Sequence, residues 1–230
     1  MDKSRLARRW LRPVLLWGIC LVAGYYALML LGLIYLKFFN PVATTVQVQR
    51  RVESFFDWDN DYDKRCDFVP LSRISRHLQR AVVAAEDGRF YEHNGIDFEE
   101  LEKVLEQNQS DGRLGRGAST ITQQLTKNLF LTTHRNVFRK AVEFTIAPVM
   151  ELVLSKERIL ELYLNVIEWG RGIYGAQAAS QHYYRIPASR LGRQQSARLA
   201  ACIPSPRTRT PSRMDWYSSV ILQRMSGRGW

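Results

Sequence analysis

The residues best placed to do chemistry end an apolar, alanine-rich segment, Ala81–Ala85, which runs directly into Glu86, Asp87 and then Gly88. The apolar spacing predicts a buried helix that stops at this point, and Gly88 predicts the turn that follows. Low polarity around a carboxylate raises its pKa and makes it a better proton acceptor. The pair is therefore either a general base with its neighbour or two solvated acids at a helix end, and this segment alone favours neither.

A second set of polar residues falls on one face of a predicted helix over residues 120–128. Thr120, Gln124 and Lys127 are spaced i, i+4 and i+7, and Gln123 lies four residues before Lys127. Residues at this spacing are neighbours on a helix surface, so hydroxyl, amide and ammonium groups would be presented together. The ordinary alternative for such a face is a solvated surface.

A third set combines two cations with one carboxylate. Arg139 and Lys140 precede Glu143 by four and three residues, so on a helix the carboxylate can face both cations. The ordinary interpretation is a surface ion pair, worth about 0–1 kcal/mol. A functional interpretation gains weight because several polar faces occur in one mostly helical chain that also carries the Glu86-Asp87 pair.

Composition limits the class of partner. The 230 residues hold 33 Lys and Arg against 22 Asp and Glu, a formal charge of +11, which suits nucleic acid, anionic lipid or a diphosphate substrate. Residues 1–12 account for +4 of this excess, and much of the rest lies beyond residue 110. The three cysteines show no CxxC or ligand spacing, which argues against a disulfide framework or a zinc site.

The N-terminal region predicts a membrane anchor. The 24 residues between Arg12 and Lys37 carry no charge, and about 20 apolar residues suffice to cross a bilayer as a helix. The run is too long for the apolar core of a signal peptide, and no small-residue cleavage site follows it. Because the basic residues precede the segment, the N-terminus is expected in the cytoplasm and the remainder outside the inner membrane.

The rest of the chain predicts a mainly α-helical fold. Apolar and polar residues alternate weakly over Val42–Arg51, which is typical of a short strand within an otherwise irregular connector. Beyond it, apolar residues recur at helical spacing. The predicted helices cover residues 73–86, 97–107, 120–128, 136–154, 156–164, 176–184, 194–202 and 217–225.

Caps and glycines mark the boundaries of these helices. Ser72 and Ser119 are expected to cap the helices that follow them. Gln109–Gly117 has three glycines among polar residues, which predicts a mobile loop, and Gly170–Gly175 predicts a second loop. The expected organisation is a basic tail at 1–12, a transmembrane anchor at 13–36, a connector at 37–69 and one domain at 70–230.

Five ordered segments resemble the signature blocks of the peptidoglycan glycosyltransferases. Glu86–Asp97 resembles their E-D-x-x-F-x-x-H-x-G-x-D signature, and Gly117–Asn128 resembles G-x-S-T-I-T-Q-Q-L-x-K-N. Arg139–Glu143, Ser155–Asn165 and Gly172–Ala176 resemble the three later blocks, in order. The resemblance covers residues 70–210, and five blocks in order make it specific. The Ser-x-x-Lys and Lys-Thr-Gly motifs of a transpeptidase partner do not occur, so the chain resembles the monofunctional biosynthetic transglycosylases.

The resemblance implies a lysozyme-like glycosyltransferase domain behind a single N-terminal transmembrane helix. The implied substrates are lipid II and the growing glycan linked to undecaprenyl diphosphate. Glu86 would be the general base on the acceptor 4-hydroxyl, and attack opposite an α-linked diphosphate would give a β1→4 bond with inversion. Further expected partners are the membrane and proteins of cell-wall synthesis or division.

The resemblance also assigns cations to the leaving diphosphate. Lys127, Arg135 and Lys140 match positions that the family uses to neutralise it, with Arg139 beside them. Glu143 matches the family's second catalytic glutamate. Its cationic neighbours would keep it ionised, which suits orienting those cations or holding Mg²⁺ or Mn²⁺ better than acting as an acid. No organic cofactor is expected.

The remaining assignments are of cleft-lining and supporting residues. The resemblance places Ser119, Thr120, Gln123 and Gln124 along the substrate cleft. The supporting residues that it implies are Asp87, His93 and Asn165. The loop over residues 112–117 is expected to close over the acceptor.

Rival functions fit some of the same residues. A glycan-cleaving enzyme, such as a lytic transglycosylase, would use Glu86 as an acid on polymeric glycan and would need no cationic cluster. A non-enzymatic membrane scaffold of the division machinery would not need Glu86. Nucleic-acid binding fits the charge alone, but an exported basic domain has little access to nucleic acid.

Overall fold

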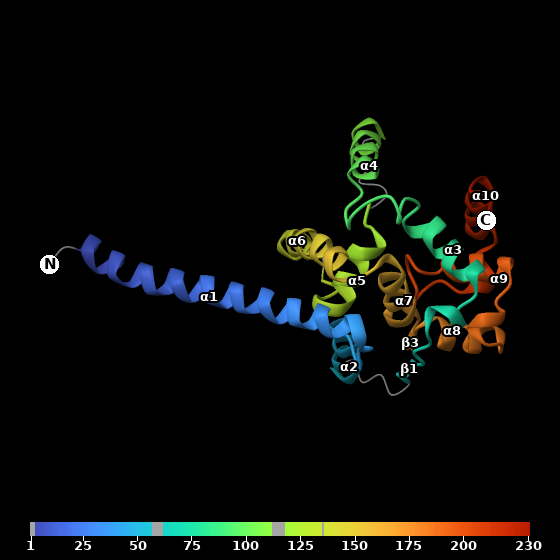
Figure 1. Cartoon of the computed structure of the whole chain (residues 1–230), viewed down its shortest axis with the longest axis horizontal. Helices are drawn as coiled ribbons and strands as arrows, with labels where there is room; N and C mark the ends of the chain where they lie inside the picture. Colours follow the sequence, from blue (N-terminus) through green and yellow to red (C-terminus); the bar gives the residue numbers. More distant parts are fainter. Residues whose placement is uncertain (1–2, 57–61, 112–117, 135) are drawn as a thin grey trace. The chain divides into compact units, whose positions relative to one another are not determined.

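The chain is mainly helical, as the sequence predicts, and divides into two compact units, Met1–Phe39 and Asn40–Trp230 (Figure 1). The computed structural model describes residues 3–56, 62–111, 118–134 and 136–230. In the second unit the helices are α2 (Thr45–Phe56), α3 (Arg76–Glu86), α4 (Phe98–Asp111), α5 (Ile121–Phe130), α6 (Val137–Val153), α7 (Lys156–Val166), α8 (Ala176–Tyr184), α9 (Arg193–Ala200) and α10 (Asp215–Gly227). Short 3-10 helices cover Leu71–Arg73, Ala188–Arg190 and Pro211–Arg213.

The first unit is dominated by one long helix, α1 (Lys3–Phe38). Its segment Arg12–Phe38 is long and apolar enough to cross a membrane, with a hydropathy of 2.2. Its apolar side chains are mostly exposed, and lipid would cover such a surface. The helix contains the predicted span of residues 13–36.

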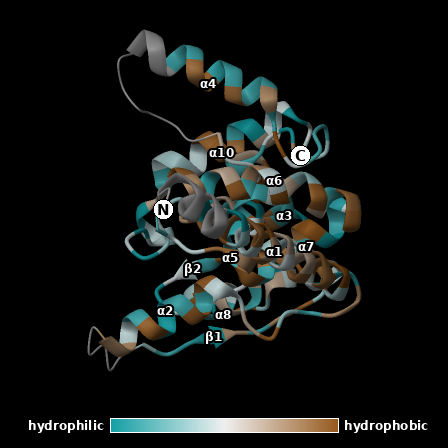
Figure 2. Ribbon diagram, turned by 90° about the vertical axis from the view of Figure 1, so that its left-hand side faces the viewer, coloured by the Kyte–Doolittle hydropathy of each residue, from teal (hydrophilic) through white to brown (hydrophobic). Residues whose placement is uncertain are grey.

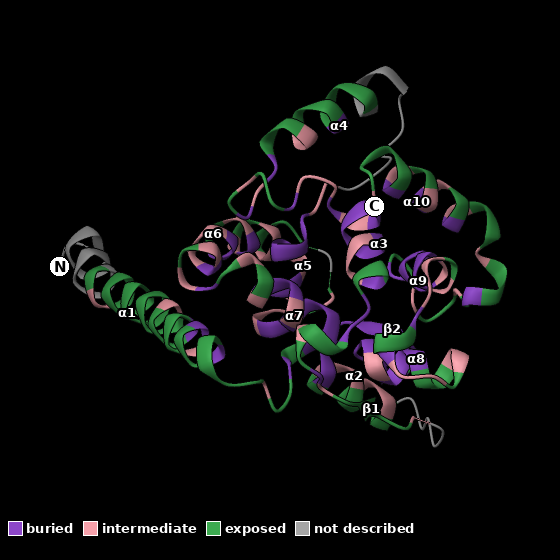
Figure 3. Ribbon diagram, turned by 45° about the vertical axis from the view of Figure 1, so that its right-hand side comes forward, coloured by how far each residue is buried: buried purple, intermediate pink, exposed green. Residues whose placement is uncertain are grey.

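The core of the second unit is built around α7. Ile159, Leu160, Leu162, Tyr163 and Leu164 are all fully buried, so most of this helix beyond its first turn lies inside the core. On one side α5 packs against α6 and α7, and on the other α3 packs against α9 and α10. Figure 3 shows buried residues concentrated in α5, α7 and α9, whereas α4 is mostly exposed. The site must therefore be built at the edges of α3 and α5, where the core reaches the surface.

Helix α4 is the most exposed helix of the described part of the second unit. Phe98 and Leu105 are exposed, and Val104 is buried. Figure 2 shows apolar and polar residues interspersed along it. The predicted range of 97–107 is close to the observed one and ends four residues early.

Two predicted helix caps are wrong by a few residues. Ser75, and not Ser72, caps α3, because its Oγ accepts the backbone hydrogen bond of the residue two positions on. Thr120, and not Ser119, caps α5, in a capping box that Gln123 completes. In each case two hydroxyl residues compete near the helix start, and only the one whose oxygen reaches the free amides can act as the cap.

The strand predicted within Val42–Arg51 is wrong, because this segment enters α2. Val46 and Gln47 are adjacent and both are buried. A strand would place adjacent residues on opposite faces, whereas a helix packed against α5 can bury both. Packing against α5 therefore decides that this segment is helical, in spite of its weak alternation of apolar and polar residues.

The described chain contains a small sheet with strand order β1-β3-β2. Strand β1 (Arg65–Cys66) pairs with β3 (Ile173–Tyr174) in parallel, and β2 (Glu168–Gly170) pairs with β3 antiparallel. The predicted loop over residues 170–175 is thus partly strand. The pairing joins the connector to the segment after α7, a long-range contact that local spacing does not encode. Cys66 and Cys202 are both free thiols.

Gly175 should be one of the most sensitive glycines of this fold. It opens α8 at φ 85° and ψ 150°, and a β-carbon there would lie 2.8 Å from the carbonyl oxygen of Asn165. We expect Gly175→Ala to lower the free energy of unfolding by about 1–3 kcal/mol, measured by denaturant unfolding of the solubilised chain. Gly227→Ala is the matched control, since nothing lies within 4 Å of its added β-carbon. Equal losses in both variants would contradict the explanation.

Candidate active site

Glu86 lies at the boundary between the core and the surface. It is the last residue of α3, whose preceding residues Ala81–Ala85 are buried, while Glu86 itself is half-buried. The helix therefore holds the carboxylate at a fixed position with one side toward apolar atoms and the other toward a cleft. This is the environment that the alanine-rich segment predicts.

Two cavities formed by the described residues meet at this carboxylate. The first, of about 840 Å³, extends toward α4 and α10, and the second, of about 630 Å³, extends toward α6. Both are lined by Glu86, Ser119, Gln124 and Pro204. A group bound in either cavity could therefore approach the same carboxylate, which is the arrangement that a transfer between two bound molecules needs.

A chain of hydrogen bonds orients Glu86. Gln124 donates through Nε2 to Glu86 Oε2 at 2.9 Å, and the Tyr163 hydroxyl donates to Gln124 Oε1 at 2.9 Å. Burial, together with the charges of Glu86 and Asp87, raises the pKa of Tyr163 well above its ordinary value. The hydroxyl thus stays a donor at neutral pH, and this fixes which end of the Gln124 amide faces Glu86.

Tyr163 is the residue of this site that sequence reasoning missed. It lies in the segment Ser155–Asn165, but its position among buried leucines of α7 is typical of a core aromatic. Only the crossing of α5 and α7 brings its hydroxyl to Gln124. Its place within a segment that resembles a signature block of the family is the sequence feature that could have identified it.

The second cavity is cationic. Lys127, Arg139, Lys140 and Glu143 line it together with Glu86. Glu143 is 3% exposed, forms an ion pair with Arg139, and accepts from Lys140 Nζ at 2.9 Å. The three cations and the buried carboxylate come from α5 and α6, which pack together. The cavity thus offers several N–H donors to an anion.

The Lys140 amine in this cavity has a lowered pKa. Its Nζ donates to Ser119 Oγ at 2.9 Å as well as to Glu143. Burial lowers the pKa of Lys140, and the neighbouring charges of Arg139 and Lys127 lower it further, to about 8. The amine therefore titrates close to physiological pH, so its charge depends on what binds beside it.

Glu143 does not fit a metal site in this arrangement. One carboxylate oxygen accepts from Arg139 and the other from Lys140. A divalent cation would have to displace both partners and would lie among three positive side chains. The observed geometry suits a carboxylate that orients two cations.

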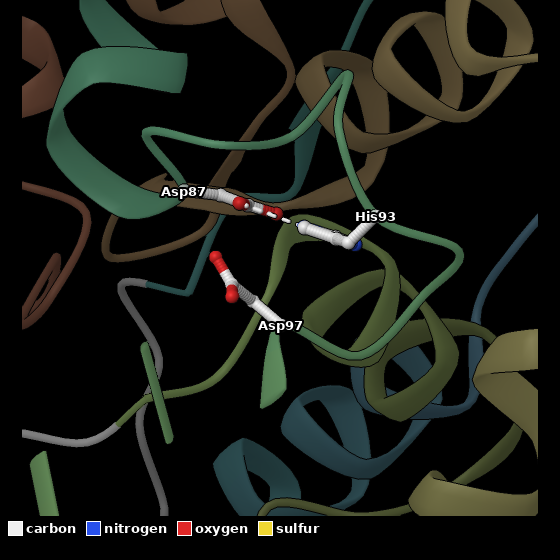
Figure 4. Close-up of side chains that lie close together, drawn as sticks. All are labelled: Asp87, His93 and Asp97. Carbon is white, nitrogen blue, oxygen red and sulfur yellow. Dashed lines mark hydrogen bonds and ion pairs between the residues drawn. The ribbon is translucent and has the colours of Figure 1, made fainter. Parts of the chain in front are cut away.

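Asp87, His93 and Asp97 form a buried cluster beside the site (Figure 4). Asp87 Oδ1 lies 2.9 Å from His93 Nε2, and its Oδ2 accepts the backbone N–H of Ile121 at 2.9 Å. Asp97 Oδ1 accepts the N–H of Glu100 at 3.0 Å. The cluster joins the end of α3 to the starts of α4 and α5. Its ligand atoms lie within 4.8 Å of one another, but its carboxylates already accept backbone hydrogen bonds.

The other predicted cleft residues divide into two groups. Ser119 and Thr120 line the first cavity, although the Thr120 hydroxyl is buried and donates to the Gly95 carbonyl at 2.6 Å. Gln123 lines neither cavity: it is 1% exposed and its Oε1 accepts the N–H of Thr120. Its predicted place in the cleft is wrong, because the capping box turns the side chain back onto the helix start.

Asn165 lies away from Glu86 and acts within the core. Its Oδ1 accepts the N–H of Val69 at 2.9 Å, and its Nδ2 donates to the carbonyls of Val69 and Glu161. It therefore fastens the connector to α7. Arg135 and the loop over residues 112–117 lie outside the described residues.

Comparisons with known proteins show the family of this chain. The family model described as Transglycosylase matches residues 52–226. A biosynthetic peptidoglycan transglycosylase of Nitrosospira multiformis is 43% identical over 95% of this chain and 96% of its own length. Proteins of the same name from Laribacter hongkongensis and Burkholderia ambifaria are 44% and 50% identical, over 93% and 69% of this chain and 98% and 66% of their own lengths. The chain therefore belongs to the transglycosylase family, among the biosynthetic peptidoglycan transglycosylases.

Proposed function

We propose that this peptidoglycan transglycosylase polymerises lipid II, with Glu86 as the general base. The observation that carries the proposal is the position of Glu86 where two cavities meet, one of them lined by cations. Glu86 accepts the proton of the acceptor 4-hydroxyl, and that oxygen forms a bond to C1 of the donor MurNAc. The bond from C1 to the diphosphate oxygen breaks, and undecaprenyl diphosphate leaves. Attack opposite the leaving group inverts C1 and gives a β1→4 linkage.

The cationic cavity is the proposed place of the donor diphosphate. Its leaving group is already anionic, so it needs charge neutralisation more than it needs a proton. Lys127, Arg139 and Lys140 provide donors there, and Glu143 holds two of them in position. A glycan-cleaving enzyme expels a sugar hydroxyl and not a diphosphate, so it needs no set of cations around its leaving group, which favours the synthetic reaction over the lytic one.

The long apolar helix fits a substrate that is itself anchored in lipid. Restricting enzyme and substrate to one plane raises their effective concentration. The basic residues before the span of Arg12–Phe38 favour a cytoplasmic N-terminus, with the second unit on the outer face of the inner membrane. We propose this orientation for the protein.

Glu86→Gln tests the reaction directly. The amide keeps the volume and can still accept from Gln124, but it cannot take a proton, so we expect lipid II polymerisation to fall at least about 100-fold. Thermal unfolding should be unchanged. Glu157→Gln, an exposed change on α7, is the control.

The same proteins should be incubated with isolated cell-wall sacculi. If the protein shortens sacculi and makes no polymer from lipid II, its reaction is lytic and not synthetic. Full polymerisation by Glu86→Gln would refute its role as the base.

Tyr163→Phe tests the hydrogen-bond chain. Losing the hydroxyl frees the Gln124 amide to rotate, so we expect kcat to fall about 3–10-fold with KM unchanged. Tyr184→Phe is the control, since its half-buried hydroxyl lies 3.5 Å from the Gln195 carbonyl and away from Glu86. In a Gln124→Ala background, Tyr163→Phe should have no further effect on kcat. Additive losses would show that the Tyr163 hydroxyl acts independently of Gln124.

The pKa of Lys140 predicts an alkaline limit. The protonated amine binds the diphosphate, and its protonated fraction falls as pH rises through about 8. We therefore expect kcat/KM for lipid II to decline as the pH rises above about 8. Lys140→Arg keeps the charge and should move the decline to higher pH. A decline at the same pH in this variant would assign it to another group.

A further inference from the structure

The wall of the first cavity that faces α3 is strongly basic. It is formed by the C-terminal segment 204–228, which lies after the last of the five signature blocks. Figure 1 shows α10 beside α3, and the two helices pack against each other. This wall contributes four arginines and no carboxylate to the cavity: Arg209, Arg213, Arg224 and Arg228. We call these residues the arginine wall.

Three members of the arginine wall are held toward the cavity. Arg224 Nη1 donates to the Ala84 carbonyl at 3.3 Å, within the last turn of α3. A β-carbon added at Gly88 would lie 2.7 Å from Arg228 Nη2, so this guanidinium lies directly against the turn after Glu86. Arg209 donates to the Ala201 carbonyl at 2.9 Å and lies over the Tyr217 ring. All four arginines thus line the first cavity, which Glu86 also lines.

The arginine wall forms no ion pair within the described part of the chain, although Glu86, Asp87, Asp97 and Glu100 line the same cavity. No described carboxylate forms an ion pair with any of the four arginines, and Asp215, the nearest acid along this segment, pairs with Arg198. The acids on the opposite side of the cavity include Asp97, which lies 3.9 Å from Arg89. Guanidinium groups gathered in a concave, partly desolvated site repel one another and attract anions. Their forked donors match phosphate and carboxylate oxygens.

We propose that the arginine wall binds the anionic part of the acceptor substrate while its 4-hydroxyl lies at Glu86. The proposal rests on the proposed function and adds residues and a charge requirement for the acceptor. Lipid II carries two anionic parts, its diphosphate and the carboxylates of its stem peptide, and both present oxygens to which arginine can donate. The exposed Trp216, stacked on Tyr217, adds an aromatic face to the same wall.

The arginine wall would select between acceptors. In a lipid II monomer the anionic groups lie within one disaccharide of the 4-hydroxyl. In a long glycan the diphosphate is many sugars away from the 4-hydroxyl end. If the wall binds the diphosphate, its arginines discriminate the monomer from a long glycan as the acceptor.

The test requires substrates that can act in one role only. Lipid II with its 4-hydroxyl capped can only donate, and an analogue with a non-cleavable phosphonate at C1 can only accept. Each is varied against the other with the full chain in detergent, so that a separate KM is obtained for donor and acceptor. The variants are Arg213→Glu, Arg228→Glu and their combination, all at exposed positions. Arg190→Glu, an exposed change that lines neither cavity, is the control with the same charge change.

We expect each single change to raise the acceptor KM about tenfold and to leave the donor KM unchanged, because each removes a charge-assisted contact to the acceptor alone. The control should match wild type. Unchanged acceptor KM in the double variant would overturn the proposal, as would an equal rise in both KM values. Thermal unfolding of each variant checks that the fold is kept.

Two truncated acceptors identify the anion. If the effect of Arg228→Glu persists without the stem peptide, the wall binds the diphosphate. If it persists with a methyl glycoside in place of the diphosphate, the wall binds the peptide carboxylates. Calorimetric binding of the acceptor analogue to each variant does not depend on turnover. Failure of wild type to couple the pair would refute the proposed function, while loss of binding in Arg213→Glu and Arg228→Glu would still support the arginine wall.

Discussion

The site depends on the way Asp87 ties the end of α3 to the start of α5. One of its oxygens pairs with His93 and the other accepts the first N–H of α5, at Ile121. An N–H at a helix start has no partner within its own helix, so a buried carboxylate there both satisfies the donor and complements the helix dipole. This contact sets where α5 begins relative to the end of α3. Glu86 and Gln124 face each other as a result, and the carboxylate proposed as the base takes its orientation from α5.

Charge in the second unit is arranged unevenly around this point. The cations of the second cavity are partly balanced by Glu143, whose burial is tolerable because each oxygen has a cationic partner. The arginine wall on the other side lacks such a carboxylate among the described residues. An anion bound on either side would therefore complete the electrostatics that the protein leaves open. Composition alone relates the excess of basic residues to any polyanion. The structure places part of that excess at two positions, the second cavity and the arginine wall.

Much of the local structure follows from the sequence. The end of α3 at Glu86, the range of α8 and the long helix containing Pro148 agree with the predicted segments. Residue type predicted the helix cap less reliably where two neighbouring hydroxyl residues could both act as the cap, as with Ser72 and Ser75 at the start of α3. The segment that became α2 was misread because its burial comes from α5, far along the chain. Periodicity reports which face a segment buries only when that face is determined locally.

The sequence by itself determined the mainly helical class and the long apolar helix, since these depend on residue type and spacing. The grouping of Glu86, Lys127, Arg139, Lys140 and Glu143 came from the resemblance of five ordered segments to a family signature. The sequence could not show that Gln123 turns back onto its own helix while Gln124 reaches Glu86, because adjacent glutamines have nearly the same local signal. Nor could it place Tyr163 behind Gln124 or the C-terminal arginines beside Gly88. Those relations join segments tens of residues apart. They exist only because burying the apolar faces of α3, α5, α7 and α10 forces these helices together.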